Sequence, residues 1–287
     1  LCAASATSLL GGAGDDSLDA SDATAPVTLR GGDGNDTLIG GSSADKLDGG
    51  DGGDELTGGL GNDTLSGGAG DDALDDTLGT NQLDGGIGND AIRFVGTWTL
   101  GATGSGLSFT SIEVIQGAGS ADVLAGTSGA DLFSVTADGV FSRNVQNQIF
   151  QGFETLQGGL GVDTVTGQDQ DDLFGVSSNG TITAYGSRLL GIERVIGGGG
   201  ADRLQGDNGT NEVFTISTTG IKVAGVAATF LDFEILSGGD GNDSLVVPSN
   251  AGSPTTWTIS QTNGGEVAGL TFANIETLRG GFGDDLF

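Results

Sequence analysis

The sequence predicts an all-β fold, a right-handed parallel β-roll or β-solenoid of nonapeptide half-coils, with hairpin flaps in its second part. Three observations predict this fold. A frame of nine residues repeats without a break from Gly31 to Arg93. A longer unit of about 40 residues carries the same frame from residue 108 onward. The composition, with 58 glycines in 287 residues and no methionine or histidine, is far from that of a globular protein.

Each nonapeptide reads as a tight turn followed by a short strand. GGDGNDTLI at 31–39, GGLGNDTLS at 58–66 and GGIGNDAIR at 85–93 show the pattern most clearly. Glycines in the first positions permit positive φ and let backbone carbonyls approach an ion. The last three residues form the strand, and the residue at position eight points into the core. Position eight is occupied by Leu9, Leu18, Leu29, Leu38, Leu47, Leu56, Leu65, Leu74, Leu83 and Ile92.

The second part repeats a longer unit. SFTSIEVIQ, IFQGFETLQ, RLLGIERVI, TFLDFEILS and TFANIETLR each carry a glutamate at position six. These glutamates, 41, 39, 41 and 42 residues apart, are Glu113, Glu154, Glu193, Glu234 and Glu276. Two further nonapeptides and an irregular segment of 12 to 15 residues complete each unit. Three half-coils and one enlarged half-coil would make two whole coils, so we expect the enlarged halves to form flaps on one side of the solenoid.

Turn pairs mark these flaps. They are Asp138-Gly139, Asn179-Gly180, Thr219-Gly220 and Asn263-Gly264. The change of repeat divides the chain into a calcium-binding β-roll of nonapeptides at 1–93 and a continuing solenoid of longer repeats at 94–287.

The charge of the chain points to bound cations. Acidic residues number 39 against 9 basic ones, which gives a formal charge of −30 and argues against nucleic acid as a partner. Coils stacked about 4.8 Å apart would bring position-six aspartates 18 residues apart close together, which is unfavourable unless cations lie between them. Calcium prefers such carboxylate and carbonyl oxygens. The chain has no histidine and a single cysteine, Cys2, so zinc, copper and iron are poor candidates and no disulfide can form within it.

GGDGNDTLI, GGLGNDTLS and GGIGNDAIR resemble the RTX (repeats-in-toxin, haemolysin-type) calcium-binding repeat. The resemblance is strong over 11–93 and partial over 108–287, where the longer units also resemble repeats of very large bacterial surface proteins. It implies a parallel β-roll that folds on several calcium ions, and export in an unfolded state by type I secretion.

The resemblance also implies where the ions bind. They should lie between loops 31–36 and 49–54, 49–54 and 67–72, and 67–72 and 85–90, and on the other side between 40–45 and 58–63. Carried over by position, the implied ligands are Asp16, Gly31, Asp33, Asp36, Asp45, Gly49, Asp51, Asp54, Asp63, Gly67, Asp72, Gly85, Asp90, Asp122, Asp163, Asp202, Asp243 and Asp285.

Departures from the pattern predict weaker sites. In the loop DTLGTN at 76–81, Asn81 replaces aspartate and Gly-Gly is missing, so we expect a weak or empty site there. Calcium should be sparser in 108–287, where the position-six glutamates make backbone hydrogen bonds or, alternatively, bind ions. For the aspartates of 31–93 the alternative role is capping of turns by their side chains.

Other readings of single features stay open. Trp98 and Trp257 lie in equivalent flaps and would either pack beneath them or bind carbohydrate. Cys2 follows a leucine, as in a lipidation site. Position seven shows no regular threonine ladder of the kind that binds ice. No stretch of eighteen apolar residues and no signal peptide is visible, so we expect no membrane insertion.

We expect no catalytic residues and no independent enzyme activity, because without histidine neither a Ser-His-Asp triad nor a histidine-bound zinc can be built. The frame starts and stops within a repeat, which is typical of part of a longer array. The sequence favours a structural or adhesive segment of a secreted bacterial surface protein or extracellular fibre, with further copies of itself or surface ligands as partners. The alternative is a calcium-driven folding and type I secretion module of a larger exoenzyme or toxin.

Overall fold

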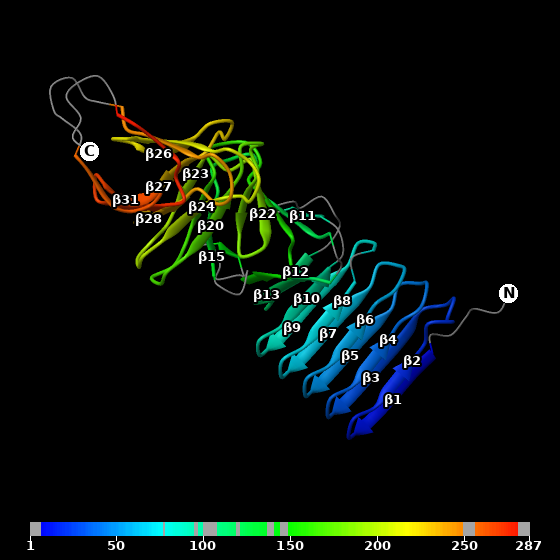
Figure 1. Ribbon diagram of the computed structural model, residues 1–287. Coiled ribbons are helices and arrows are strands. Elements are labelled where there is room, and N and C mark those ends of the chain that lie inside the picture. The colour runs from blue at the N-terminus through cyan, green and yellow to red at the C-terminus, as the bar shows by residue number, and fades with distance from the viewer. Residues whose placement is uncertain are drawn as a thin grey trace. The chain divides into compact units, whose positions relative to one another are not determined.

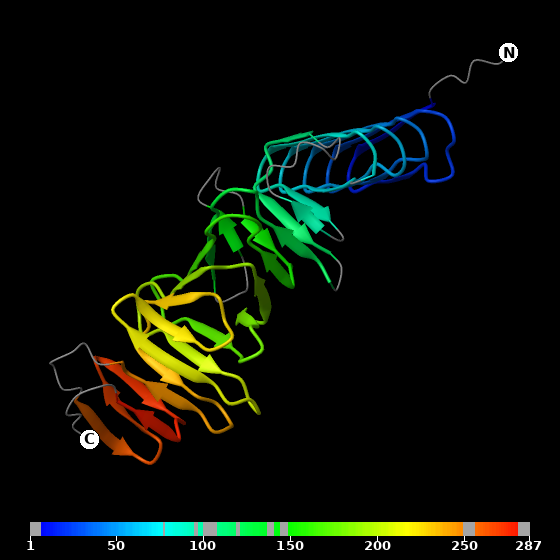
Figure 2. The ribbon, with the colours of Figure 1, turned by 90° about the horizontal axis from the view of Figure 1, so that it is seen from above.

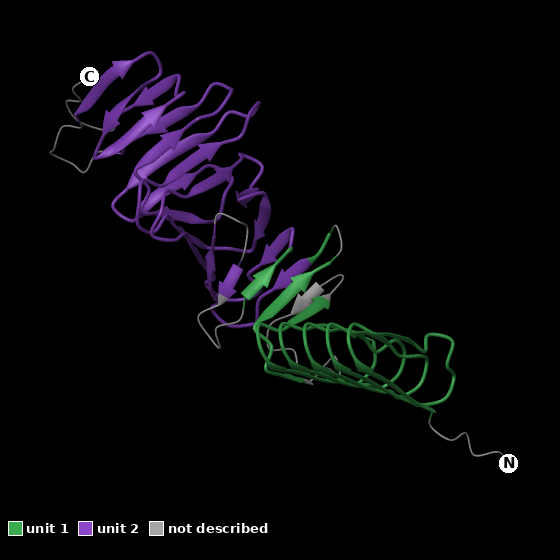
Figure 3. Ribbon diagram, turned by 90° about the horizontal axis from the view of Figure 1, so that it is seen from below, with its two compact units in different colours: residues 1–122, 145–152 green, residues 123–144, 153–287 purple. Residues whose placement is uncertain are grey.

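The computed structural model describes residues 7–76, 78–94, 97–99, 108–118, 121–136, 141–143, 149–248 and 256–280, and every regular element among them is a β-strand. This confirms the all-β prediction. Two compact units are present (Figure 3): unit 1 comprises 1–122 and 145–152, and unit 2 comprises 123–144 and 153–287. The sequence boundary at residue 93 marks a change of repeat type and stays a prediction. No helix long and apolar enough to cross a membrane occurs in the described ranges.

Unit 1 contains short strands that each end or begin at a glycine-rich turn. They are β1 (Thr7–Ala13), β2 (Ser17–Asp19), β3 (Val27–Asp33), β4 (Thr37–Ile39), β5 (Lys46–Asp51), β6 (Glu55–Thr57), β7 (Thr64–Ala69), β8 (Ala73–Asp75), β9 (Gln82–Ile87), β10 (Ala91–Phe94), β11 (Thr97–Thr99), β12 (Ser108–Thr110), β13 (Val114–Gly117) and β17 (Ile149–Gln151).

The strands of unit 1 alternate between two parallel sheets (Figures 1 and 2). One sheet runs β1-β3-β5-β7-β9-β12, and the other runs β2-β4-β6-β8-β10-β13-β17. Successive coils pair in register, so that Leu29 lies beside Leu47 and Leu47 beside Leu65. Odd and even nonapeptides therefore occupy opposite faces, as the half-coil reading predicts.

The core of unit 1 is the row of position-eight side chains. From Leu29 to Ile92 each is at most 2% exposed: Leu29, Leu38, Leu47, Leu56, Leu65, Leu74, Leu83 and Ile92. Leu9 and Leu18, in the first coil, are only half-buried. The stacked coils thus supply one another's hydrophobic neighbours, as the repeat predicts.

Unit 2 contains strands of three to five residues. They are β14 (Val123–Ala125), β15 (Leu132–Val135), β16 (Phe141–Arg143), β18 (Thr155–Gln157), β19 (Thr164–Thr166), β20 (Leu173–Val176), β21 (Ile182–Ala184), β22 (Ser187–Leu190), β23 (Arg194–Ile196), β24 (Arg203–Gly206), β25 (Val213–Ser217), β26 (Gly220–Val223), β27 (Thr229–Leu231), β28 (Ile235–Ser237), β29 (Ser244–Val246), β30 (Trp257–Gln261), β31 (Gly264–Val267), β32 (Leu270–Ala273) and β33 (Thr277–Arg279).

The expected hairpins are present, but they lie within the sheets and alternate between them. The meander β20-β21-β22 belongs to the sheet that also contains β30-β31-β32, whereas β25-β26-β27 belongs to the other sheet. The expectation of flaps on one side was wrong. The reason is that each glutamate nonapeptide opens with a strand that completes the meander, as β22 does by pairing antiparallel with β21. A unit therefore spans three half-coils, and its meander changes face in each successive unit.

The hairpin turns follow small polar residues. Asn179-Gly180 lies in the β20–β21 connection, where the Gly180 amide donates to the Ser177 carbonyl. In β25–β26 the paired residues are Ser217 and Gly220, so the turn falls one residue earlier than the expected Thr219-Gly220. Asn263 is likewise in the turn itself, with φ 57°, and Gly264 begins β31. The pair Asp138-Gly139 lies outside the described residues.

Candidate metal centre

A continuous row of carboxylates links the coils on one side of unit 1. Oδ1 of each position-six aspartate accepts a hydrogen bond from the amide of its equivalent one coil earlier. The Asp36 amide donates to Asp54 at 2.7 Å, and the Asp54 amide donates to Asp72 at 2.8 Å. The row begins at Asp16, which donates to Asp36 at 2.7 Å, and continues to Asp90. One carboxylate oxygen of each residue is thereby committed to the backbone.

A second row runs along the opposite side. The Asp45 amide donates to Oδ1 of Asp63 at 2.7 Å, and the Asp63 amide donates to Oδ1 of Asn81 at 2.9 Å. Asn81 can preserve this backbone contact because its amide oxygen replaces one carboxylate oxygen. These contacts join neighbouring coils, so they differ from the capping within a single turn that the sequence left open.

The other oxygen, Oδ2, is buried without a hydrogen-bond partner in most full-pattern loops. This applies to Asp36, Asp54, Asp63, Asp72, Asp90, Asp163, Asp202 and Asp243. A buried carboxylate oxygen without a donor or a cation is strongly unfavourable. Something absent from the protein chain itself must therefore satisfy these oxygens in the folded state.

Backbone carbonyls point into the same space. A β-carbon placed on Gly31 would stand 2.6 Å from the Gly49 carbonyl oxygen and closer still to Asp36 Oδ2. The equivalent point at Gly49 lies 2.6 Å from the Gly67 carbonyl oxygen, again with Asp54 Oδ2 closer. The point at Gly67 is 2.5 Å from the Gly85 carbonyl oxygen. Each position-one glycine thus borders a small cradle of oxygens that a side chain would fill.

The conformation at position two determines whether Oδ2 is left unsatisfied. Where that residue is a glycine with positive φ, as at Gly50 and Gly68, Oδ2 of the loop has no partner. In loop 40–45 the Gly41 φ is not positive, and its amide donates to Asp45 Oδ2 at 2.6 Å. Glycine at position two therefore matters because it turns this amide away from the carboxylate.

The cradles suit a hard cation such as calcium. They offer carboxylate and carbonyl oxygens and no sulfur or imidazole, which is the ligand set that calcium prefers. The position-six aspartates and the carbonyls of Gly31, Gly49, Gly67 and Gly85 would hold the ions. No group of three or more histidine, cysteine, aspartate or glutamate side chains is placed to bind a metal in the described part of the chain, so backbone carbonyls would have to supply much of each coordination shell.

Several predicted ligands lie elsewhere. The side chains of Asp33 and Asp51 are exposed, at position three of their loops, and Asp45 already receives the Gly41 amide. Their ligand roles stay predictions. Asp122 is 1% exposed, and its Oδ2 lies 2.9 Å from the β-carbon position of Gly117, as in the other cradles. Asp285 lies outside the described residues.

The glutamates of the longer units extend the rows by hydrogen bonding. Oε2 accepts the amide of the preceding position-six aspartate in four cases, from Asp90 to Glu113 at 3.0 Å and from Asp163 to Glu193 at 2.8 Å. The other two acceptors are Glu234 and Glu276. The expectation of backbone hydrogen bonds is confirmed for these four glutamates.

Some buried acids in the same rows were missed by the sequence reading. Asp131 and Asp172 occupy position six of weaker loops, and their Oδ2 atoms accept the amides of Thr127 and Gln168, both at 2.6 Å. Glu212 is fully buried, with Oε2 unpartnered, because its loop has one extra residue. A count from the next buried apolar residue backwards, rather than from the glycines forwards, would have found Glu212.

Burial raises the pKa of the unsatisfied carboxyls. It brings the pKa of Asp72 to about 6, against the opposing hydrogen bond from the Asp54 amide. Burial, with the charges of Glu212 and Glu276 adding to it, raises the pKa of Asp243 to about 6. In the absence of cations these groups therefore resist ionisation.

Acidification should partly replace calcium. A carboxyl with a raised pKa in the folded chain favours folding most below its ordinary value of 3.8, and that contribution is lost as pH rises through about 6. We expect calcium-stripped chain to gain β-structure by circular dichroism as pH falls from neutral toward 4. With saturating calcium the trend should be the opposite, because protons compete with the ion. A stripped chain equally unfolded across this range would contradict the expectation.

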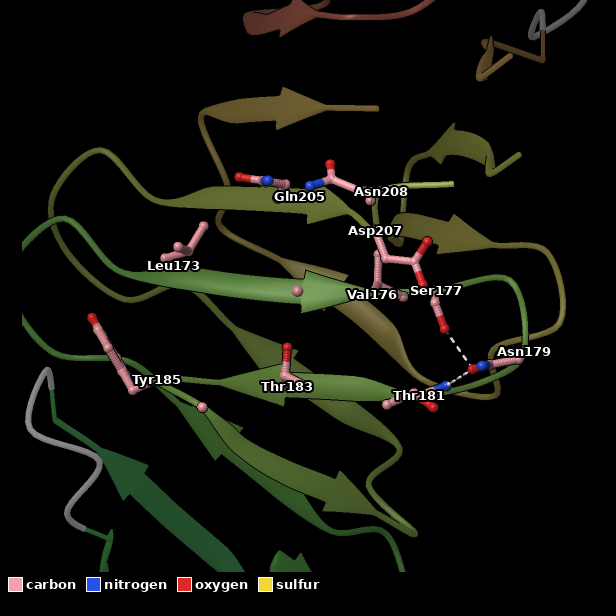
Figure 4. A pocket seen from close by; sticks show the side chains of 13 residues that line it. Leu173, Val176, Ser177, Asn179, Thr181, Thr183, Tyr185, Gln205, Asp207 and Asn208 are labelled. Atoms are coloured by element: carbon pink, nitrogen blue, oxygen red, sulfur yellow. Dashed lines mark hydrogen bonds between the residues drawn. The ribbon is translucent and has the colours of Figure 1, made fainter. Parts of the chain in front are cut away.

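The largest pocket described lies in unit 2 between β20, β21 and β24 (Figure 4). It has a volume of about 430 Å³ and is lined by apolar, hydroxyl and amide side chains. Its one lining carboxylate is Asp207, which accepts the hydroxyl of Thr210 at 2.6 Å. Tyr185 at its edge donates to Asp172, outside the lining. The pocket therefore offers no pair of acids placed for acid–base chemistry.

Comparison with known proteins identifies the repeat. The family model described as RTX calcium-binding nonapeptide repeat (4 copies) matches residues 6–23, 28–56, 57–92, 110–135, 150–175, 190–215 and 232–246, together more than half of the chain. No curated protein matches the chain. The matched segments include the described cradle loops of both units, among them those of Asp36, Asp63, Asp163 and Asp202.

Proposed function

Because this chain belongs to the family of RTX calcium-binding nonapeptide repeat proteins, we propose that it is a calcium-dependent structural or adhesive segment of a secreted bacterial surface protein or extracellular fibre. Repeats of this family form calcium-dependent modules of secreted proteins. The individual ligands assigned above, the location at the cell surface and the adhesive role belong to the proposal.

The observation that carries the proposal is the continuity of the buried carboxylate rows through both kinds of repeat. In unit 2 the Asp131 amide donates to Asp163 at 2.8 Å, and the Asp172 amide donates to Asp202 at 2.8 Å. The coil-to-coil contact of the nonapeptides is thus kept in the longer units, although their loops are more varied. An array that binds cations along its length is stiffened by them, which suits a load-bearing or spacing segment.

We propose that the segment itself has no enzyme activity. The sequence contains no histidine, and the pocket of Figure 4 has a single lining carboxylate. The alternative function, a folding and secretion module of a larger exoenzyme or toxin, is favoured by the uniform loops of 49–72, where three successive full-pattern nonapeptides occur.

Deletion of the coding segment for these residues from the producing bacterium separates the two functions. The structural proposal expects loss of calcium-dependent attachment or matrix cohesion, with secreted enzyme activities unchanged. Loss of a secreted hydrolytic or toxic activity, with attachment unchanged, would instead support the secretion module. In-frame deletion of one 40-residue unit serves as the control for general effects on export.

A further inference from the structure

Loop 76–81 departs from its neighbours by carrying an acid at position one. The equivalent residues of the loops before it on the same side are Gly40 and Gly58, whereas this loop begins with Asp76. It also lacks the position-six acid, which is replaced by Asn81. The loop therefore keeps one negative charge but moves it from position six to position one.

The carboxylate of Asp76 occupies the place of a cradle carbonyl. A β-carbon on Gly40 would meet the carbonyl oxygen of Gly58, as in the regular loops. A β-carbon on Gly58 would instead meet Asp76 Oδ2, with Asp63 Oδ2 at 3.0 Å. Two carboxylate oxygens thus converge where the other cradles combine one carboxylate with one carbonyl.

Both acids are buried and unsatisfied. Asp76 is 2% exposed and neither of its oxygens accepts a hydrogen bond, while Asp63 is 1% exposed and its Oδ2 has no partner. The ion pairs found in the described residues, Arg30–Asp48 and Arg93–Glu55, involve neither acid. Two unscreened carboxylates this close would repel each other strongly in a buried site.

Asn81 does not compete for the site. Its Nδ2 donates to the carbonyls of Asp76 and Leu78 at 3.3 and 3.1 Å, and its Oδ1 accepts the Asp63 amide. It therefore holds the loop in shape from within. A surface cavity of about 390 Å³, lined in part by Gly59, Leu60 and Asp76, gives an ion a route to the pair from solvent.

We propose that Asp63 and Asp76 together hold a calcium ion between loops 58–63 and 76–81, at a position where the repeat pattern alone expects a weak or empty site. The inference rests on the proposal that the array binds calcium. Two carboxylates supply more negative charge than the single acid of a regular cradle, and charge count is a main determinant of calcium affinity. The site is therefore expected to be among the tighter ones of the array.

The test is the number of calcium ions bound by the full chain, counted by native mass spectrometry and by equilibrium dialysis. Asp76→Asn and Asp63→Asn should each lose one ion, or weaken that ion's affinity about tenfold or more. The double variant should lose the same single ion, because the two side chains share it. Asp75→Asn is the matched control, since it removes an equal charge from an exposed neighbour and should leave the count unchanged.

Each outcome bears on the inference. Unchanged counts and affinities in both single variants would overturn it and would indicate a shared proton between the two acids. Loss of two ions in the double variant would also overturn it, since the acids would then serve separate sites. If Asp76→Asn does not fold in calcium, Asp76→Gly installs the residue of the neighbouring loops and should lose the same ion. A wild-type chain that binds no calcium would refute the proposed function itself.

Discussion

Removing calcium from the purified chain is expected to convert its far-UV circular dichroism spectrum from that of β-structure to that of a largely unfolded chain. The folded state places Asp36, Asp54 and Asp72 in one row, each at most 2% exposed and each with an unpartnered oxygen. Each coil buries only about two leucines, so hydrophobic burial is small and does not offset the repulsion of a chain with formal charge −30. The cation is therefore needed for folding.

A calcium titration of stripped chain measures this effect. The midpoint should fall at about 0.1–1 mM, the affinity range of extracellular modules. Magnesium at the same ionic strength is the control, and it should be far less effective because it is smaller and demands octahedral geometry. A β-spectrum that persists after complete calcium removal at neutral pH would show that the unsatisfied oxygens are tolerated without the ion.

The register and the core of unit 1 could be predicted from the sequence because a nine-residue period fixes both. Once Leu47 and Leu65 share position eight, the 18-residue coil places them side by side, as the structure shows. The same period predicted the carbonyls of Gly49 and Gly67 as cradle groups, and they point into the cradles. Period alone thus determines which atoms meet between coils.

Other features depend on local conformation, which the period does not fix. Asp45 and Asp63 occupy equivalent positions, yet only Asp45 Oδ2 accepts an amide, because the φ of Gly41 is not positive and that of Gly59 is. Both loops begin with Gly-Gly, so the second glycine by itself does not reveal its conformation.

The faces of the meanders were also hidden in the sequence. The segment from Ser187 to Leu190 reads as the start of a glutamate nonapeptide, but it forms β22 and pairs antiparallel with β21 and parallel with β18. One strand can continue the solenoid and close the hairpin at once. Counting half-coils by length therefore overestimates them by one in each unit.

Replacing Gly159 by alanine is expected to destabilise unit 2 far more than the same change at Gly209. Both glycines have nearly equal positive φ, 107° and 105°, so alanine incurs a similar backbone cost of about 1–2 kcal/mol at each. At Gly209 the new methyl group has no heavy atom within 4 Å. At Gly159 it would collide with the Thr127 carbonyl oxygen of the preceding coil.

The collision at Gly159 cannot be relieved cheaply, because the same Thr127 carbonyl accepts the Leu160 amide at 3.2 Å and so joins the two coils. We expect the overpacking to cost a further ~1–3 kcal/mol in the free energy of unfolding, measured by urea denaturation in saturating calcium. Hydrogen exchange at the Leu160 amide should accelerate in Gly159→Ala and stay unchanged in Gly209→Ala. Equal losses in both variants would mean that backbone conformation alone, and not the close approach of successive coils, requires glycine at position two.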